Sequence, residues 1–210
     1  MQLKQTARFS NLFILAERLE LGQRVDPSVI ARYGYLIEEI VEEGRCRSDL
    51  LMSGATVTLA TLDDHEASRS SPEWTGAAVN AERFLAHSTT CAPLNGNFWL
   101  RRAMVSEALG RSSDLVAQHM TRAQATAPAE QDIVIARLYA WNRMNASILD
   151  LAAYAALQDL HIGVLNADAR LLASALLPLS ESLKALMPEV AIGLSLERKH
   201  ELKRAGIDID

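Results

Sequence analysis

Cys46 and Cys91 are the two cysteines of this chain, and their places in the helical pattern allow them to react with each other. Apolar periodicity puts Cys46 at the start of a third helix and Cys91 at the end of a fourth. If these helices are antiparallel neighbours, both thiols lie at the same end of a hairpin, where they could form a disulfide. In the chain-entropy model this bond would stabilise the fold by roughly 4 kcal/mol.

The state of these cysteines bears on the compartment of the protein. A disulfide favours an oxidising compartment, so it would indicate a periplasmic or otherwise exported protein. The alternative is a pair of buried free thiols in a cytoplasmic protein, because cysteine packs readily as a small hydrophobe. The first residues, with Arg8 and Ser10 interrupting them, lack the apolar run of a signal peptide, so export would require a signal ahead of Met1.

Other residue types that support catalysis are scattered along the chain. We find no HExxH or other dense ligand spacing, and no local sequence evidence for a histidine beside either cysteine. A glycine-rich phosphate loop, a G-x-S-x-G elbow and a dinucleotide fingerprint are also missing from the sequence. The sequence therefore predicts a protein that is not an enzyme, with no metal site and no cofactor. The histidines fall one to a helical segment: His65, His87, His119, His161 and His200.

Tryptophans and arginines provide the candidate interaction surface. Flat apolar rings suit a carbohydrate or a peptide, and arginines on a concave face would receive an acidic peptide or an anionic polymer. The alternative is that the tryptophans pack in the core and the arginines are ordinary helix-surface charges. The candidate surface consists of Trp99, Arg101, Arg102, Arg137, Trp141 and Arg143.

The composition predicts that helices position these residues. Of the 210 residues 49% are apolar, but only 5% are aromatic and 10 are glycine, which favours helices over a β-sandwich. Gly22, Gly44 and Gly110 are expected helix stops, and Asp26-Pro27 is an expected helix start. We predict an all-α, antiparallel α-hairpin array of about nine to eleven helices, either a solenoid or a bundle.

The predicted helices form one domain over residues 1–210. Within it, residues 1–90 hold N-terminal helices, residues 91–161 hold repeat-like helix pairs, and residues 162–210 hold capping helices. The predicted bounds are about 5–21, 27–43, 48 to before 68, 72–90, 97–109, 113–127, 130–143, 146–161, 168–176 and 194–205, with a short segment before Leu186.

A period of 35 residues runs through the middle of the chain. It separates Pro93 from Pro128, and it also separates Gly110 from Asn145, which tolerates the left-handed conformation of a tight turn. Such a period equals one helix-turn-helix repeat, although any array of antiparallel helices of this length would show a similar one.

Residues in the first of these units resemble the tetratricopeptide repeat. The resemblance covers about 70 residues, and it departs from the family pattern at Arg102, Ser106 and Val116. It implies stacked α-hairpins that present an extended surface to another protein. The matching positions are Trp99, Ala103, Gly110, Ala123 and Pro128, with one inserted residue after the glycine.

A second and looser resemblance involves three segments in order: Asp26-Pro27, the run Cys46-Arg47-Ser48-Asp49-Leu50-Leu51, and residues 91–100. Together they look like accessory proteins encoded near bacterial exopolysaccharide synthesis and export machinery. This resemblance implies an envelope location and no defined activity. The partner it implies is another protein, such as a component of a membrane-bound assembly.

Charge and hydropathy exclude two kinds of partner. The net charge of -5 gives phosphates no general attraction, so we expect no nucleic acid. The apolar runs fall short of the roughly 20 residues of a membrane span. Of the remaining classes, a non-enzymatic scaffold or adaptor for protein–protein interaction ranks first, ahead of a saccharide- or small-ligand-binding module and an enzyme subunit with a dispersed site.

Overall fold

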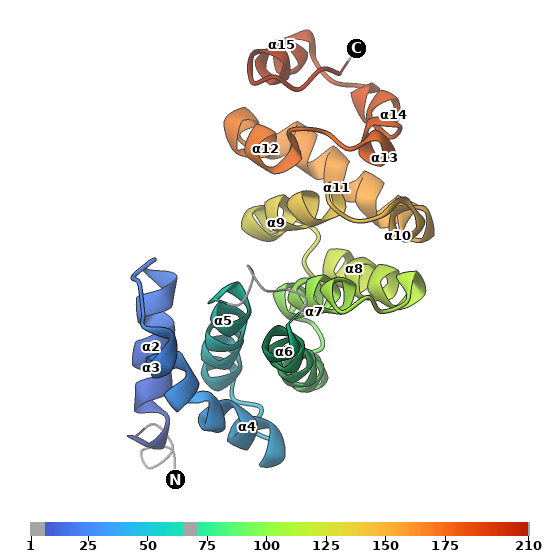
Figure 1. Ribbon diagram of the computed structural model, residues 1–210. Helices are drawn as coiled ribbons and strands as arrows, with labels where there is room; N and C mark the ends of the chain where they lie inside the picture. Colours follow the sequence, from blue (N-terminus) through green and yellow to red (C-terminus); the bar gives the residue numbers. More distant parts are fainter. Residues whose placement is uncertain (1–6, 65–70, 210) are drawn as a thin grey trace. The chain divides into compact units, whose positions relative to one another are not determined.

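The computed structural model describes residues 7–64 and 71–209, and every regular element within them is a helix (Figure 1). No strand occurs in this described part of the chain, so the prediction of an all-α protein is confirmed. The described helices are α2 to α15, more than the nine to eleven expected, because some expected helices are broken in two. None of them is both long and apolar enough to cross a membrane.

Contacts within the chain divide it into two compact units. The N-terminal unit comprises residues 1–93 and the C-terminal unit comprises residues 94–210. That the whole chain folds as one domain stays a prediction.

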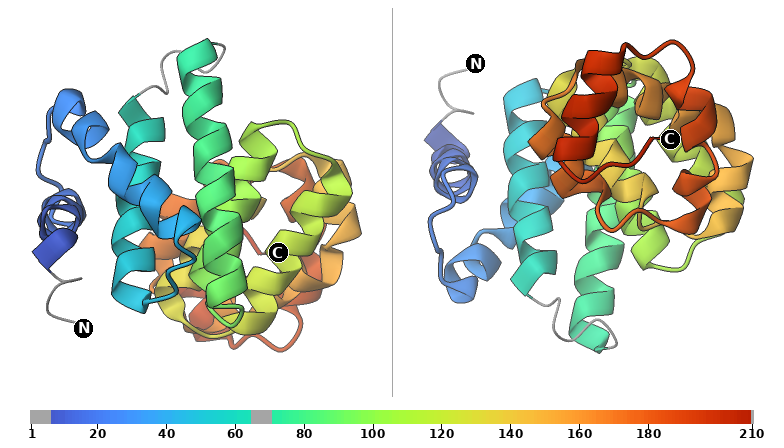
Figure 2. Two further views of the ribbon diagram at one scale, coloured as in Figure 1. Left: turned by 90° about the horizontal axis from the view of Figure 1, so that it is seen from below. Right: turned by 90° about the horizontal axis from the view of Figure 1, so that it is seen from above.

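Helix α5 (Ser48–Asp64) is the centre of the N-terminal unit. It contacts α2 (Ser10–Glu20), α3 (Pro27–Arg32), α4 (Gly34–Glu42) and α6 (Pro72–Cys91). Helices α5 and α6 lie side by side and run in opposite directions (Figures 1 and 2). Their apolar faces pack together, and the largest side chains that they bury completely are Leu50, Leu51, Phe84 and Leu85.

The helix expected over residues 27–43 is broken into α3 and α4. Asp26 caps its start as predicted, because its carboxylate accepts the backbone N–H of Ser28 at 2.8 Å. Tyr33, with φ -101° and ψ 3°, then leaves helical geometry just before Gly34, and glycine is a poor helix former. Gly44 ends α4 in the left-handed conformation at φ +60°, which turns the chain toward Cys46.

The C-terminal unit is a succession of short helices. They follow one another as layers from α7 and α8 to α15 (Figure 1). Helices α7 and α8 form the most extensive helix pair, joined at Gly110 as the repeat spacing predicts. The helices are α7 (Gly96–Ala108), α8 (Ser113–Thr126), α9 (Gln131–Trp141), α10 (Ala146–Leu151), α11 (Ala153–Asn166), α12 (Ala169–Leu176), α13 (Glu181–Lys184), α14 (Met187–Ala191) and α15 (Leu196–Arg204).

The helix expected over residues 146–161 is also interrupted. Ala152, with φ -120° and ψ 24°, separates α10 from α11. Asn145 is not left-handed; its backbone is extended, and its side chain caps α10 by accepting the N–H of Ile148 at 3.0 Å. An asparagine between two helices therefore serves here as the start of the second.

The chain ends by returning to its own core. After α15 the C-terminal segment turns inward, and Ile207 and Ile209 are buried in the apolar core of the C-terminal unit (Figure 2). That core also contains Leu138, Trp141 and Leu160 from α9 and α11. The last residues therefore help to close the end of the helical stack.

Candidate functional site

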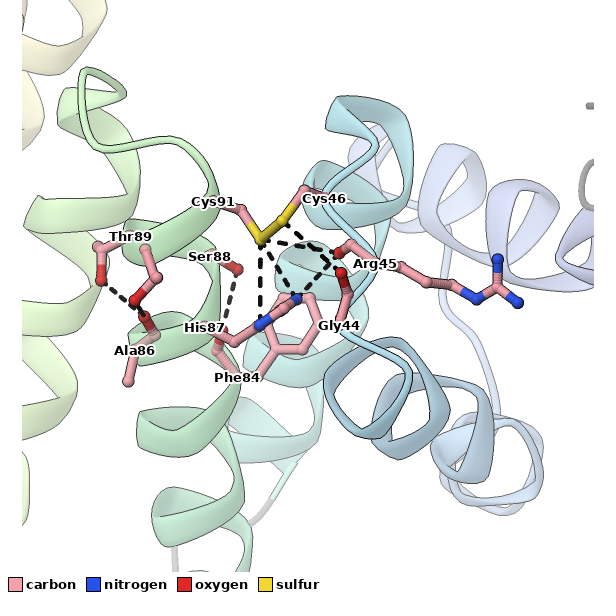
Figure 3. The surroundings of a disulfide bond; sticks show 10 residues. Gly44, Arg45, Cys46, Phe84, Ala86, His87, Ser88, Thr89 and Cys91 are labelled. Atoms are coloured by element: carbon pink, nitrogen blue, oxygen red, sulfur yellow. Dashed lines mark hydrogen bonds between the residues drawn. A yellow bond between two sulfur atoms is a disulfide. The ribbon is translucent and has the colours of Figure 1, made fainter.

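Cys46 and Cys91 form a disulfide, with an S–S distance of 2.00 Å (Figure 3). Cys46 lies in the turn before α5, and Cys91 is the last residue of α6. The antiparallel packing of these two helices brings the sulfurs to one end of the hairpin, as the sequence predicts. The disulfide is therefore confirmed, and it is consistent with an oxidising compartment.

His87 lies beside this disulfide (Figure 3). Its Nε2 is 2.9 Å from the carbonyl oxygen of Arg45 and 3.5 Å from the Sγ of Cys91. A carbonyl oxygen only accepts hydrogen bonds, so Nε2 is the donor in this contact, and in the neutral tautomer with the proton on Nε2 the Nδ1 atom has a lone pair for a ligand. That Nδ1 atom is 4.0 Å from the Sγ of Cys91.

The expectation that no histidine neighbours either cysteine is wrong. His87 and Cys91 are four residues apart on α6, and this spacing places two side chains on the same helix face. The i, i+4 relation was visible in the sequence and could have identified the pair. The third member, Cys46, comes from a separate segment and needed the fold.

Cys46, His87 and Cys91 bring sulfur and nitrogen atoms together within 4.8 Å of one another. Cys46 is exposed, while the other two are half-buried. The neighbouring arginines engage other groups. The Arg45 side chain points away from the sulfurs (Figure 3). It pairs with Glu43, and Arg47 pairs with Asp49 at 2.5 Å.

Two of the predicted surface residues, Arg137 and Trp141, are fully buried, so their assignment to an interaction surface is wrong. Arg137 binds the carboxylate of Asp159 through two hydrogen bonds, at 2.8 and 2.7 Å. It also donates to the carbonyls of Ala123 and Ala127 at 3.1 and 2.9 Å, and the indole N–H of Trp141 donates to Asp159 at 2.8 Å. These bonds connect the end of α8 to α9 and α11.

The buried pair of Arg137 and Asp159 stabilises the helix packing. Burial raises the pKa of the Asp159 carboxyl, and the bonds from Arg137 and Trp141 oppose that rise. Both charged groups are completely removed from solvent, so each depends on the other for its stability there. The arrangement fixes the helix packing and leaves no group free for a ligand.

Trp99 and Arg102 line an open groove in the C-terminal unit, with a cavity volume of about 550 Å³. Residues of α7 and α8 and the last residue of α10, Leu151, form its walls. Leu151 is 54% exposed, which leaves an apolar side chain available to a partner. We call this the Trp99 groove; its other lining residues are Asp114, Ala117, Gln118, His119, Thr121 and Arg122.

The Trp99 ring is already engaged by its neighbours. The guanidinium of Arg102 lies 5.7 Å from the ring centroid, and the ring of His119 lies at the same distance with a tilt of 39°. Trp99 is half-buried and therefore forms part of the groove wall instead of an open flat face.

The remaining members of the predicted surface lie outside the groove. Arg101 is half-buried on α7 and donates to the side chain of Asn97 at 3.1 Å. Arg143 is exposed after α9, where its guanidinium stacks 3.3 Å from the ring centroid of Tyr139. Of the six predicted residues, the structure brings only Trp99 and Arg102 together at one concavity.

Comparisons with family models, with curated proteins and with solved structures give no match to this chain.

Proposed function

We propose that this protein is a non-enzymatic helical scaffold whose C-terminal unit binds an acidic segment of another protein in the Trp99 groove. The observation that carries the proposal is the composition of that groove. It combines two guanidinium groups with an exposed leucine in one open concavity of about 550 Å³.

Charge complementarity favours an acidic occupant. The lining contains two arginines, Arg102 and Arg122, and one carboxylate, that of Asp114, so its formal charge is positive in a chain of net charge -5. Arginine forks match carboxylates in geometry as well as charge. An acidic peptide is therefore attracted to this groove more than to the average surface of the protein.

The apolar part of the groove favours a peptide over a saccharide. A sugar ring stacks best on an open aromatic face, but Arg102 and His119 lie against the ring of Trp99. Leu151 offers aliphatic surface that suits a leucine or isoleucine side chain of the partner. We therefore take an acidic peptide with apolar residues as the occupant.

The class of partner follows from the resemblance to exopolysaccharide accessory proteins. On that basis we propose that the acidic segment belongs to a component of a bacterial envelope assembly for exopolysaccharide synthesis or export. The groove chemistry supports an acidic segment, and the resemblance alone supports this choice of assembly.

The test is fluorescence anisotropy of the full chain with a labelled peptide of alternating glutamate and leucine, beside a matched lysine–leucine peptide. We expect the acidic peptide alone to bind, and added salt to weaken the binding. Arg122→Glu should weaken it by about tenfold or more, which corresponds to about 1.4 kcal/mol. Arg143→Glu is the matched control, because it reverses an exposed arginine outside the groove.

Two results would contradict the proposal. One is equal binding of the acidic and basic peptides, or no binding of either. The other is binding of an oligouronate that Arg122→Glu abolishes while the peptide fails to bind, which would replace the peptide by an anionic saccharide.

A further inference from the structure

We propose that Cys46, His87 and Cys91 form a zinc site when the disulfide is reduced. Two thiolates and one imidazole would supply three protein ligands, and the fourth position would be open to water. This set of soft and borderline ligands is one that Zn²⁺ prefers. In the oxidised chain the same sulfurs are bonded to each other and hold no metal.

Small side-chain movements bring the three ligand atoms to the distances of a tetrahedral ion. Zn–S and Zn–N bonds of about 2.3 and 2.0–2.1 Å place a sulfur and a nitrogen ligand roughly 3.6 Å apart. The proposed ligand atom, Nδ1 of His87, is 4.0 Å from the Sγ of Cys91, so a small rotation of the ring or of the cysteine would bring the two to the required spacing. The shorter distance of 3.5 Å belongs to Nε2, which donates to Arg45. The sulfurs need a separation of roughly 3.8 Å by the same geometry, which they can reach by side-chain rotation after the bond breaks.

The helix already orients two of the ligands. His87 and Cys91 occupy positions i and i+4 of α6, so they project from one helix face. Cys46 approaches from the turn before α5, which the Gly44 turn directs toward the end of α6. Two separate segments therefore hold the ligand set within 4.8 Å without a ligand being supplied from elsewhere.

The hydrogen bond of His87 provides the second shell of such a site. A metal-bound histidine normally donates its other ring N–H to a carboxylate or a backbone carbonyl, which fixes the tautomer and the ring. Here Nε2 donates to the carbonyl of Arg45 at 2.9 Å, which leaves Nδ1 as the metal ligand. This bond is present before any metal binds, and it distinguishes the cluster from a chance grouping of two cysteines and a histidine.

The reduction step consumes a thiol reductant. Two reductant thiols transfer two electrons to the disulfide, become a disulfide themselves, and leave Cys46 and Cys91 as thiols. Zn²⁺ then displaces one proton from each thiol to solvent and accepts the lone pair of His87 Nδ1. Cys46 is exposed, so both reductant and ion have access to the sulfurs.

The test is a cobalt titration of the full chain, because Co²⁺ bound by thiolates in a tetrahedral site absorbs in the near ultraviolet and the visible. The protein is reduced with a phosphine, which does not compete as a thiol ligand, and the helical content is followed by circular dichroism. We expect one Co²⁺ to bind the reduced chain, Zn²⁺ to displace it, and the oxidised chain to show no thiolate band.

The histidine is tested separately from the cysteines. His87→Ala should weaken Co²⁺ binding by about 10- to 100-fold or more and remove the tetrahedral visible bands, whereas the half-buried His161→Ala should change neither. His87→Ala retains both cysteines, so its fold is verified in the oxidised state.

Three outcomes would overturn the proposal. The first is a reduced, helical chain without a thiolate band. The second is a band that His87→Ala leaves unchanged, since that would be adventitious binding to two thiols. The third applies if the reduced chain unfolds: a thiolate band without recovery of helix on addition of Zn²⁺ contradicts the site. Recovery of helix in that case supports it.

Discussion

The two units of this chain join their helices by different means. In the N-terminal unit a covalent bond connects Cys46 and Cys91, which are separated by 45 residues and lie at or near the surface. In the C-terminal unit an ion pair between Arg137 and Asp159 connects α9 and α11, and both side chains are completely buried. One cross-link tolerates solvent, and the other exists only where solvent is excluded.

The difference teaches where each cross-link acts. In the chain-entropy model a disulfide works chiefly by restricting the unfolded chain, so its effect depends little on the packing around it. A buried ion pair acts in the folded state alone, and its attraction has to offset the desolvation of two charges. We therefore expect the ion pair to be the more sensitive of the two to the loss of a single partner.

The largest effect is expected for Arg137→Met, which leaves the carboxylate of Asp159 buried without its partner. The free energy of unfolding should fall by about 3–5 kcal/mol. Urea unfolding in a Trp74→Phe background would measure it, because the remaining tryptophans, Trp99 and Trp141, both lie in the C-terminal unit. Arg143→Met, which removes an exposed arginine, should cost about 1 kcal/mol or less.

The pH dependence of Arg137→Met tests whether the buried charge of Asp159 causes its loss of stability. Arg137 lowers the pKa of Asp159 against the effect of burial, so its removal raises that folded-state pKa further above the unfolded value. A carboxyl group whose pKa is raised in the folded state makes the fold less stable as pH rises through that pKa. The destabilisation should therefore shrink as pH falls toward the ordinary range of a carboxyl group. If the loss in free energy of unfolding does not change with pH, the uncompensated charge of Asp159 is not its cause.

The second effect concerns the disulfide. Replacement of both cysteines by serine should lower the free energy of unfolding by about 2–4 kcal/mol, because the unfolded chain regains the freedom that the closed loop removes. Trp74 is the tryptophan of the N-terminal unit, and its fluorescence in urea would follow the change. Reduction of the native chain in the presence of a chelator should give a similar loss. An unchanged midpoint would show that packing alone holds α5 and α6.

The smallest effects are expected for alanine substitutions at one glycine in each unit, which compare how tightly the two units are packed. A methyl group on Gly54 would overlap the ring of Phe84 between α5 and α6, and this ring is buried and rigid. Gly54→Ala should therefore destabilise the protein by about 1–3 kcal/mol.

Gly163→Ala is the matched substitution in the C-terminal unit. Its methyl group would lie 2.6 Å from a terminal methyl of Leu138, which can rotate away. A gain of about 1 kcal/mol in helix propensity would offset most of the remaining cost. Thermal unfolding of both variants should thus show a clear decrease for Gly54→Ala and a change within about 1 kcal/mol for Gly163→Ala. Equal decreases would mean that the two units tolerate extra volume alike.

Much of the fold was predictable because its signals are local. Asp26 and Gly44 mark helix ends through bonds to their own neighbours, and the helix periodicity around Cys46 and Cys91 placed the disulfide correctly. The breaks at Tyr33 and Ala152 are harder to predict, because both occur within continuous apolar patterns without a proline, and Gly34 is the one local signal of the first break.

The sites were less predictable because they depend on distant partners. The sequence favours a surface position for Arg137, because a buried arginine requires a specific acceptor and Asp159 is 22 residues away on another helix. The groove brings Trp99 of α7 together with Leu151 of α10, a proximity that periodicity does not contain. His87 was different, because its spacing from Cys91 lay within one helix and could have been recognised.

The position of the disulfide has a consequence for the integrity of the molecule. Every peptide bond between Cys46 and Cys91, including those of the linker from α5 to α6, lies inside a closed covalent ring. A protease that cuts once within this ring opens it but releases no fragment. The nicked chain would migrate as one species without reductant and as two fragments with it, so cleavage here would stay hidden until the cystine is reduced.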